Sequence, residues 1–543
     1  MKSIREESKL LASLAVFREL YDSKQSDVYA VIGEFLKEII TSNGKYQFNL
    51  TEITNLLNNT FEFSIPEAVV NTALRRLDYL QKDQHFYIVK KMPHTDELRV
   101  NTLQEQTLNK NNALIEELFS FIESKQSIIL PDDEKTKIVQ SLHSFLLEES
   151  SGTDYSEYIS AFAVKNKNDP SFRESLNKIR EGVILYSGIK YINLGEMGTW
   201  NTYLTIYLDT EILFHFAGYN GKIQKTIFED FFGYVKEINN RAKKLLIKLE
   251  YFKEVTKEID SFFAKAEYIV DGKDILNPKI TAMQSVVDGC RSLSDVSNKK
   301  ADFYLFIMQN GITESGTTNY FDPSNHKYNI VDQKLAESLS KEVGFDITEN
   351  LNFLNFVNIQ RQGVKQNNFE NAGYILLTGN SITRRLAFHE QIKLESTIPL
   401  ATTLNWITNR FWFKLNKGFG NGDLPISFDV ITKAQIVLSS ILSKSIGEKY
   451  DELQSQYKAG KITDELVKAR IIELRSQVKK PEEIQQDDVS QILDVVSEDS
   501  LEQFIKEQEA AKNEVLKQSE ENLKLKRELS LKKQALENRV VPE

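Results

Sequence analysis

The strongest constraint on the fold is the run YLTIYLDT at residues 203–210, a nearly continuous stretch of apolar and β-branched side chains that ends on an acid. A run of this kind predicts a strand buried on both faces, as in a parallel sheet. Ligands of open α/β sheets bind just beyond the carboxyl ends of the strands. Asp209 stands at such an end. We therefore expect its carboxylate either to line that crevice or to cap a helix beginning near Glu211.

Length and composition exclude several classes of protein. A chain of 543 residues is too long for one ordinary core, so we expect several domains. The single cysteine, Cys290, excludes an internal disulfide and a cysteine-based zinc cluster. No segment approaches the ~18 apolar residues that a membrane span needs, and the N-terminus predicts an amphipathic helix, so we expect a cytoplasmic protein. The net charge of −10 means that nucleic-acid contact would need a local basic patch or metal ions.

Residues 1–100 are expected to form one small module. Helical periodicity begins near residue 27, a second helix starts at Leu50, a third runs over 66–77, and a short strand covers 86–91. Three helices and a β element resemble a winged helix.

That resemblance implies nucleic-acid binding by the third helix and the wing. The residues that would contact phosphates are Arg75, Arg76, Lys90 and Lys91. The alternative is a partner-binding module whose paired arginines form a solvated face.

The rest of the chain divides into three further segments by pattern. Residues 101–198 read as a helical linker domain without a site signal, and residues 199–415 alternate apolar strands with amphipathic helices, as in an α/β sheet. Residues 416–543 read as a helical arm, with a hairpin turned at 459–461. The predicted strands of the α/β segment are 203–208, 266–270, 373–377 and one near 398–400.

Three segments of this α/β region carry the chemistry. They are LDTEILF at 208–214, a helix over 251–263 that contains Glu258, and YILLTGNS at 374–381. An acid after the first strand, an acid on a following helix and a strand ending in Thr-x-Asn resemble PIN-like domains, an α/β family of metal-dependent ribonucleases and related nucleases. The usual Asp-Thr-Asn start of that family has Glu211 in place of its asparagine.

The resemblance implies a Mg²⁺ or Mn²⁺ site. Asp209 would be the first metal ligand and Glu258 the second, and Asn380 stands where the family has its last acid or an asparagine. Such a cluster can hold a phosphate, activate water and stabilise the leaving oxygen. Magnesium prefers oxygen ligands, which fits a chain poor in Cys and His and rich in Asp and Glu.

The third acid of the site is not fixed by the sequence. The family carries it at the start of a helix that later holds an arginine, here the helix over 350–361, where the candidates are Glu349 and Asn352. Asp302 and Asp346 are further candidates. If the position is Asn352, the site has lost a charge.

The leading function is metal-dependent nuclease activity, with RNA favoured over DNA by family habit. By analogy such architectures suit toxin or antiviral-defence effectors. The rival is a non-enzymatic interaction or regulatory subunit with a degenerate PIN-like domain in a larger complex. A long helix predicted over 500–537 has a partly polar heptad seam, typical of a weak coiled coil, and we expect it to order against another copy or a different subunit.

Overall fold

The computed structural model describes residues 4–24, 27–92, 100–147, 154–191, 198–316, 323–330, 333–343, 346–393, 397–417 and 424–497. Packing divides the chain into two compact units. The first comprises residues 1–276, 280–439 and 480–487, and the second comprises 277–279, 440–479 and 488–543. The predicted helix over 500–537 lies outside the described residues.

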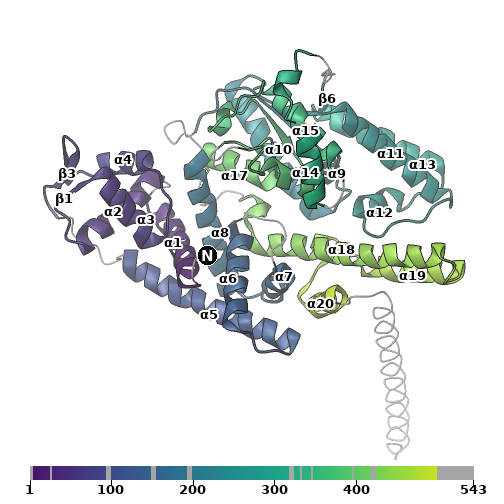
Figure 1. Ribbon diagram of the computed structural model, residues 1–543, viewed down its shortest axis with the longest axis horizontal. Helices are drawn as coiled ribbons and strands as arrows, with labels where there is room; N and C mark the ends of the chain where they lie inside the picture. The colour runs from purple at the N-terminus through teal and green to yellow at the C-terminus, as the bar shows by residue number, and fades with distance from the viewer. Residues whose placement is uncertain are drawn as a thin grey trace, which may run out of the picture. The chain divides into compact units, whose positions relative to one another are not determined.

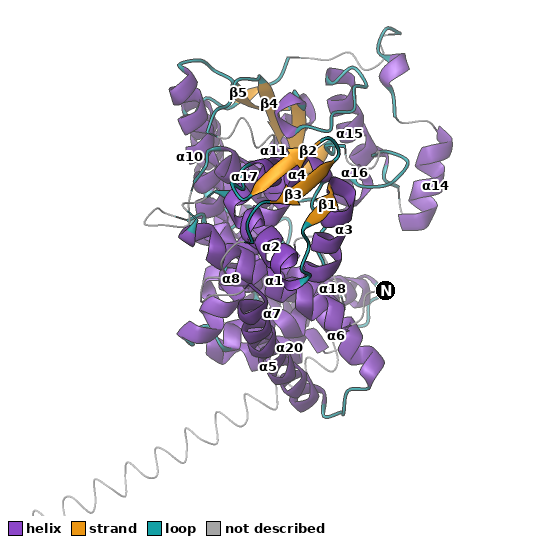
Figure 2. Cartoon of the chain, turned by 90° about the vertical axis from the view of Figure 1, so that its left-hand side faces the viewer, coloured by secondary structure: helices purple, strands orange, loops and turns teal. Residues whose placement is uncertain are grey.

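The N-terminal region combines helices with a three-stranded antiparallel sheet of order β1-β3-β2 (Figure 2). The predicted third helix ends at Arg75, and Asn49 caps α3 by accepting a hydrogen bond from the Glu52 amide. Phe48 and Tyr87 face each other across β1 and β3, with ring centroids 6.0 Å apart. The elements are α1 (Ile4–Ser23), α2 (Val28–Ser42), β1 (Gln47–Asn49), α3 (Leu50–Phe61), α4 (Glu67–Arg75), β2 (Leu80–Asp83) and β3 (Phe86–Val89).

The described residues between 100 and 191 are mostly helical, as expected for the segment 101–198. The first helix, α1, packs along α8 so closely that a Cβ on Gly182 would lie 1.9 Å from the Leu14 carbonyl oxygen. A cut near residue 100 would therefore expose a buried face of α1. The helices are α5 (Val100–Gln126), α6 (Asp132–Leu147), α7 (Ser156–Lys165) and α8 (Pro170–Tyr191).

A five-stranded parallel sheet of order β6-β5-β4-β7-β8 forms the centre of the following region (Figure 1). The strands predicted at 203–208 and 373–377 are confirmed as β4 and β7. The strands are β4 (Leu204–Leu208), β5 (Ile247–Tyr251), β6 (Thr313–Glu314), β7 (Tyr374–Leu377) and β8 (Ala401–Thr402).

Helices surround this sheet, and α11 and α13 run side by side in Figure 1. They are α9 (Thr210–Ala217), α10 (Lys222–Ala242), α11 (Lys253–Val270), α12 (Thr281–Val287), α13 (Leu293–Gln309), α14 (Gln333–Val343), α15 (Thr348–Gln360), α16 (Ser381–Ala387) and α17 (Leu404–Lys414), with the 3₁₀ turns η2 (His326–Tyr328), η3 (Phe369–Asn371) and η4 (Ile426–Phe428).

Two strand predictions need correction. The strand predicted at 266–270 is wrong, because the buried stripe Val255, Ile259, Phe263 and Ala266 continues one helical face to the end of α11. The strand predicted near 398–400 begins at Ala401.

The strand β5 was not predicted. Its buried Glu250, paired with Lys248, hides the apolar pattern of a buried strand.

The C-terminal helices include the predicted hairpin, whose turn contains Gly460 at φ +69°. Within the second unit, the Lys449 ammonium donates to the Val495 carbonyl at 2.9 Å and so caps α20. No helix in the described part of the chain is long and apolar enough to cross a membrane. The elements are α18 (Val430–Lys458), α19 (Asp464–Gln477), η5 (Pro481–Glu483), η6 (Gln486–Asp488) and α20 (Val489–Ser497).

Candidate functional site

The strand order places a topological switch point between β4 and β7. From β4 the chain builds outward through β5 and β6 on one side, and β7 and β8 lie on the other. Open α/β sheets bind ligands beyond the carboxyl ends of the strands at such a point. Leu208 pairs with Leu377, so the next residues, Asp209 and Thr378, leave the sheet side by side.

Asp209 is both a helix cap and a half-buried carboxylate of this crevice. It accepts a hydrogen bond from the Thr210 amide at 2.7 Å, which caps α9, and a second from the Thr378 hydroxyl. Burial raises the pKa of Asp209, and these two hydrogen bonds oppose the rise without cancelling it. The sequence left open whether Asp209 lines the crevice or caps a helix, and in the structure one side chain does both.

Glu258 reaches the same crevice from α11. Its carboxylate accepts a hydrogen bond from the Thr210 hydroxyl, so Thr210 contacts both acids. Burial is the main cause that raises the pKa of Glu258, and the nearby charges of Asp209, Glu349 and Glu254 raise it further. No basic side chain of the described residues forms an ion pair with Asp209 or Glu258.

Asn380 reaches the site through its backbone. Its amide N–H donates to the Thr378 hydroxyl oxygen at 3.0 Å, and that hydroxyl donates to Asp209. Its side-chain oxygen accepts from the amides of Ile382 and Thr383 and caps α16. As the structure stands, the side chain of Asn380 is a cap, and its predicted role as metal ligand would require this oxygen to leave the cap.

Of the third-acid candidates, Glu349 is the one whose charge acts on Glu258. It is exposed, in the first turn of α15. Asp346 accepts from the Thr348 amide at 2.9 Å and is a local cap.

The other two candidates have no contact with the site. Asp302 lies on α13, where its charge acts on Tyr219, and Asn352 is exposed on α15. Over the described ranges, no group of three or more His, Cys, Asp or Glu side chains is placed to hold a metal ion.

Sequence reasoning missed the role of Glu211 and Gly379. A Cβ on Gly379 would lie 2.1 Å from a Glu211 carboxylate oxygen, so this acid rests against the turn that follows β7. Burial and the charge of Asp209 raise the pKa of Glu211, and Arg384 opposes the rise. The signal was present in the sequence, because Glu211 stands where an Asp-Thr-Asn motif would have its asparagine.

The arginine that follows α15 has a structural role. Arg361 is buried and donates to the carbonyls of Tyr374, Ile398 and Pro399 at 2.7, 3.0 and 2.9 Å. Burial lowers its pKa to about 9. Arg361 thus joins the end of α15 to β7 and to the segment before β8.

The four predicted phosphate contacts of the N-terminal module differ in their surroundings. Arg76 pairs with Asp27 at 2.8 Å and stacks on the Tyr29 ring at 4.2 Å. Arg75, Lys90 and Lys91 are exposed, and none forms an ion pair with another described residue.

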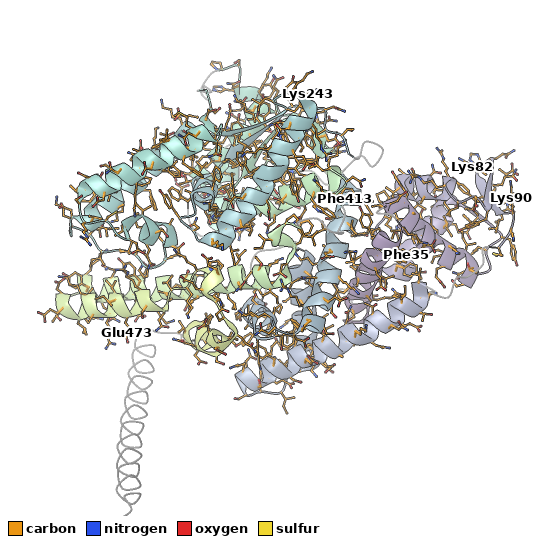
Figure 3. All side chains as sticks on the ribbon, turned by 180° about the vertical axis from the view of Figure 1, so that it is seen from behind. Phe35, Lys82, Lys90, Lys243, Phe413 and Glu473 are labelled. Carbon is orange, nitrogen blue, oxygen red and sulfur yellow. The ribbon has the colours of Figure 1, made fainter. Side chains whose placement is uncertain are left out.

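The two lysines line an open cavity of about 570 Å³. Figure 3 labels Lys82 and Lys90 at the outer end of the N-terminal region and Phe35 inside it. The cavity walls also carry Glu34 and Asp78, so the surface is mixed in charge.

Comparisons with protein-family models, with curated proteins and with solved structures find no match for this chain.

Proposed function

We propose that this chain is a metal-dependent nuclease of PIN-like type, acting on RNA in preference to DNA. The observation that carries the proposal is the pair Asp209 and Glu258, two carboxylates joined through Thr210 at the switch point of a parallel sheet. Acids so close to each other are costly unless a cation or a proton is shared. Burial is the main cause that raises the pKa of each acid, and the charge of Asp209 raises the pKa of Glu258 further.

The donor set fits Mg²⁺ or Mn²⁺ in chemistry. Magnesium keeps several waters and is held by one or two carboxylates together with substrate phosphates, so a third acid is not required. Asp209 and Glu258 would hold the ion, which would polarise the phosphate and lower the pKa of a bound water. Thr210 and Thr378 orient the two carboxylates through hydrogen bonds.

The flanking parts would direct this activity. The proposed nucleic-acid contact of a winged-helix-like module consists of Arg75, Lys90 and Lys91. Arg76 is already in an ion pair with Asp27. The C-terminal arm would bind another copy of the chain or a different subunit. Both roles are proposals that rest on the sequence pattern.

A cleavage assay tests the function. End-labelled single-stranded RNA and DNA are incubated with the full chain in Mg²⁺, in Mn²⁺ and in EDTA. We expect cleavage in either metal and none in EDTA, with Asp209→Asn and Glu258→Gln abolishing it. The matched control is Asp302→Asn, an acid of the same region whose charge acts elsewhere.

A non-enzymatic subunit is the second candidate. It is favoured by the lack of a three-acid group among the described side chains and by the use of Asn380 as a cap. Wild-type protein that fails to cleave either nucleic acid in either metal would support this candidate and reject the nuclease.

A further inference from the structure

Among the described residues, the guanidinium of Arg384 has no hydrogen-bond acceptor. Arg384 lies on α16, one turn after Asn380. Its Nε is buried, and the group makes no hydrogen bond or ion pair with any residue that the structure describes. A guanidinium has five N–H donors, and a buried donor without a partner costs free energy.

Two buried arginines of the first unit, Arg180 and Arg361, make hydrogen bonds that Arg384 lacks. Arg180 donates to the carbonyls of Leu146 and Ser427 at 3.0 and 3.2 Å. Arg361 donates to three carbonyls. These side chains join elements of the fold through hydrogen bonds, whereas Arg384 makes no hydrogen bond with any described residue.

The place of Arg384 is the crevice already described. Its charge acts on Glu211, whose carboxylate rests on the turn at Gly379 beside Asp209. Arg384 and Glu211 nevertheless form no ion pair. A positive group and the acids thus face the same edge of the sheet without neutralising each other.

Phosphate is a ligand that suits both the guanidinium of Arg384 and a cation held by the acids. The planar fork of arginine fits phosphate oxygens with two parallel hydrogen bonds. A phosphate beside Glu211 and Asp209 would be repelled unless a divalent cation lay between them. With that cation present, the phosphate would be held by the cation on one side and by the guanidinium on the other.

We propose that Arg384 is the phosphate-binding residue of this site and holds the phosphodiester of a nucleic acid at the carboxyl edge of β4 and β7. The proposal rests on the proposed function for the identity of the substrate. The anion site itself can be tested without any cleavage.

The first experiment measures stabilisation by inorganic phosphate. Thermal midpoints of the full chain are recorded in sodium phosphate and in sodium chloride of equal ionic strength. Because phosphate also stabilises proteins by exclusion from their surface, the comparison is between variants. We expect Arg384→Gln to lose the site-specific part of the gain, and Arg385→Gln, its exposed neighbour on α16, to keep it. Equal gains for wild type and Arg384→Gln would overturn the proposal.

The second experiment measures binding of a labelled single-stranded oligonucleotide in Mg²⁺, with a phosphorothioate backbone that resists cleavage. We expect Arg384→Gln to weaken binding about tenfold or more and to lower the salt slope by about 0.7, the value for one lost contact to a single strand. Arg384→Lys should restore part of the affinity, because it returns the charge without the fork. Unchanged affinity and slope would refute the assignment.

The two proposals can fail separately. If wild type does not cleave but the phosphate effect depends on Arg384, the anion site stands and the nuclease is rejected. If wild type cleaves and Arg384→Gln retains its kcat and KM, the nuclease stands and the role of Arg384 is rejected. Circular dichroism of Arg384→Gln and Arg384→Lys is recorded alongside, to check that both variants are folded.

Discussion

Replacing Asp209 by asparagine separates a helix cap from a cation ligand, because the two side chains have almost the same shape. Asparagine caps helices as well as aspartate, so the bond from the Thr210 amide survives. The bond from the Thr378 hydroxyl loses its charged acceptor, a loss of about 1–3 kcal/mol. The raised pKa of Asp209 means that its charge destabilises the fold at neutral pH, and the variant recovers that free energy. Without metal we therefore expect a free energy of unfolding within about 1 kcal/mol of wild type.

Magnesium then distinguishes the two proteins. A ligand at ten times its Kd stabilises the state that binds it by about 1.4 kcal/mol, and at a hundred times by about 2.7 kcal/mol. We expect this gain for wild type and for Asp302→Asn, and none for Asp209→Asn. The assay is urea unfolding followed by circular dichroism, in EDTA and over a series of Mg²⁺ concentrations. If Asp209→Asn gains as much as wild type, Asp209 is a cap and not a metal ligand.

Three further predictions follow from the same contacts. The pKa values of Asp209 and Glu258 in the folded state lie above their ordinary values of 3.8 and 4.5. At a pH between the ordinary and the raised values, the folded state therefore binds more protons than the unfolded chain. The stability of wild type relative to the double variant Asp209→Asn/Glu258→Gln should therefore rise as pH falls from neutral through the raised pKa values, and urea midpoints that keep a constant difference would contradict this. Arg361→Met leaves three carbonyls without donors and should cost about 3 kcal/mol or more in urea unfolding; a loss under about 1 kcal/mol would mean that water replaces the guanidinium. Arg75→Ala should lower the salt slope of nucleic-acid binding, whereas Arg76→Ala should mainly remove the contacts of Arg76 with neighbouring residues. Equal effects of the two variants on the slope would show that both arginines contact phosphate.

Features with a local cause were predictable from the sequence. The buried strand before Asp209 and the strand ending at Leu377 follow from unbroken apolar runs, and the structure confirms both. The cap of α3 by Asn49 has the same local origin, since a cap depends on residues at most a few positions away.

Features that depend on partners distant in the sequence were not predictable. The strand at 247–251 is fixed by pairing with β4 and β6, whereas its own pattern, with exposed Lys248 and buried Glu250, disguises it. The helix α11 was predicted only in part, because its single buried face was assigned to a helix as far as residue 263 and to a strand from residue 266.

The candidate site shows the same division most clearly. The sequence alone indicated Asp209 and Glu258 as acids of one crevice, through the order of the segments that carry them. Only the tertiary structure placed Thr378, 169 residues away, in hydrogen-bond contact with Asp209. The packing of Glu211 on Gly379 was likewise decided by tertiary structure, since it depends on where the turn after β7 meets the helix after β4. The same holds for the guanidinium of Arg384, which finds no acceptor among the residues that the structure describes. Periodicity and capping act within a few residues, whereas the register between parallel strands brings together residues that no local pattern connects.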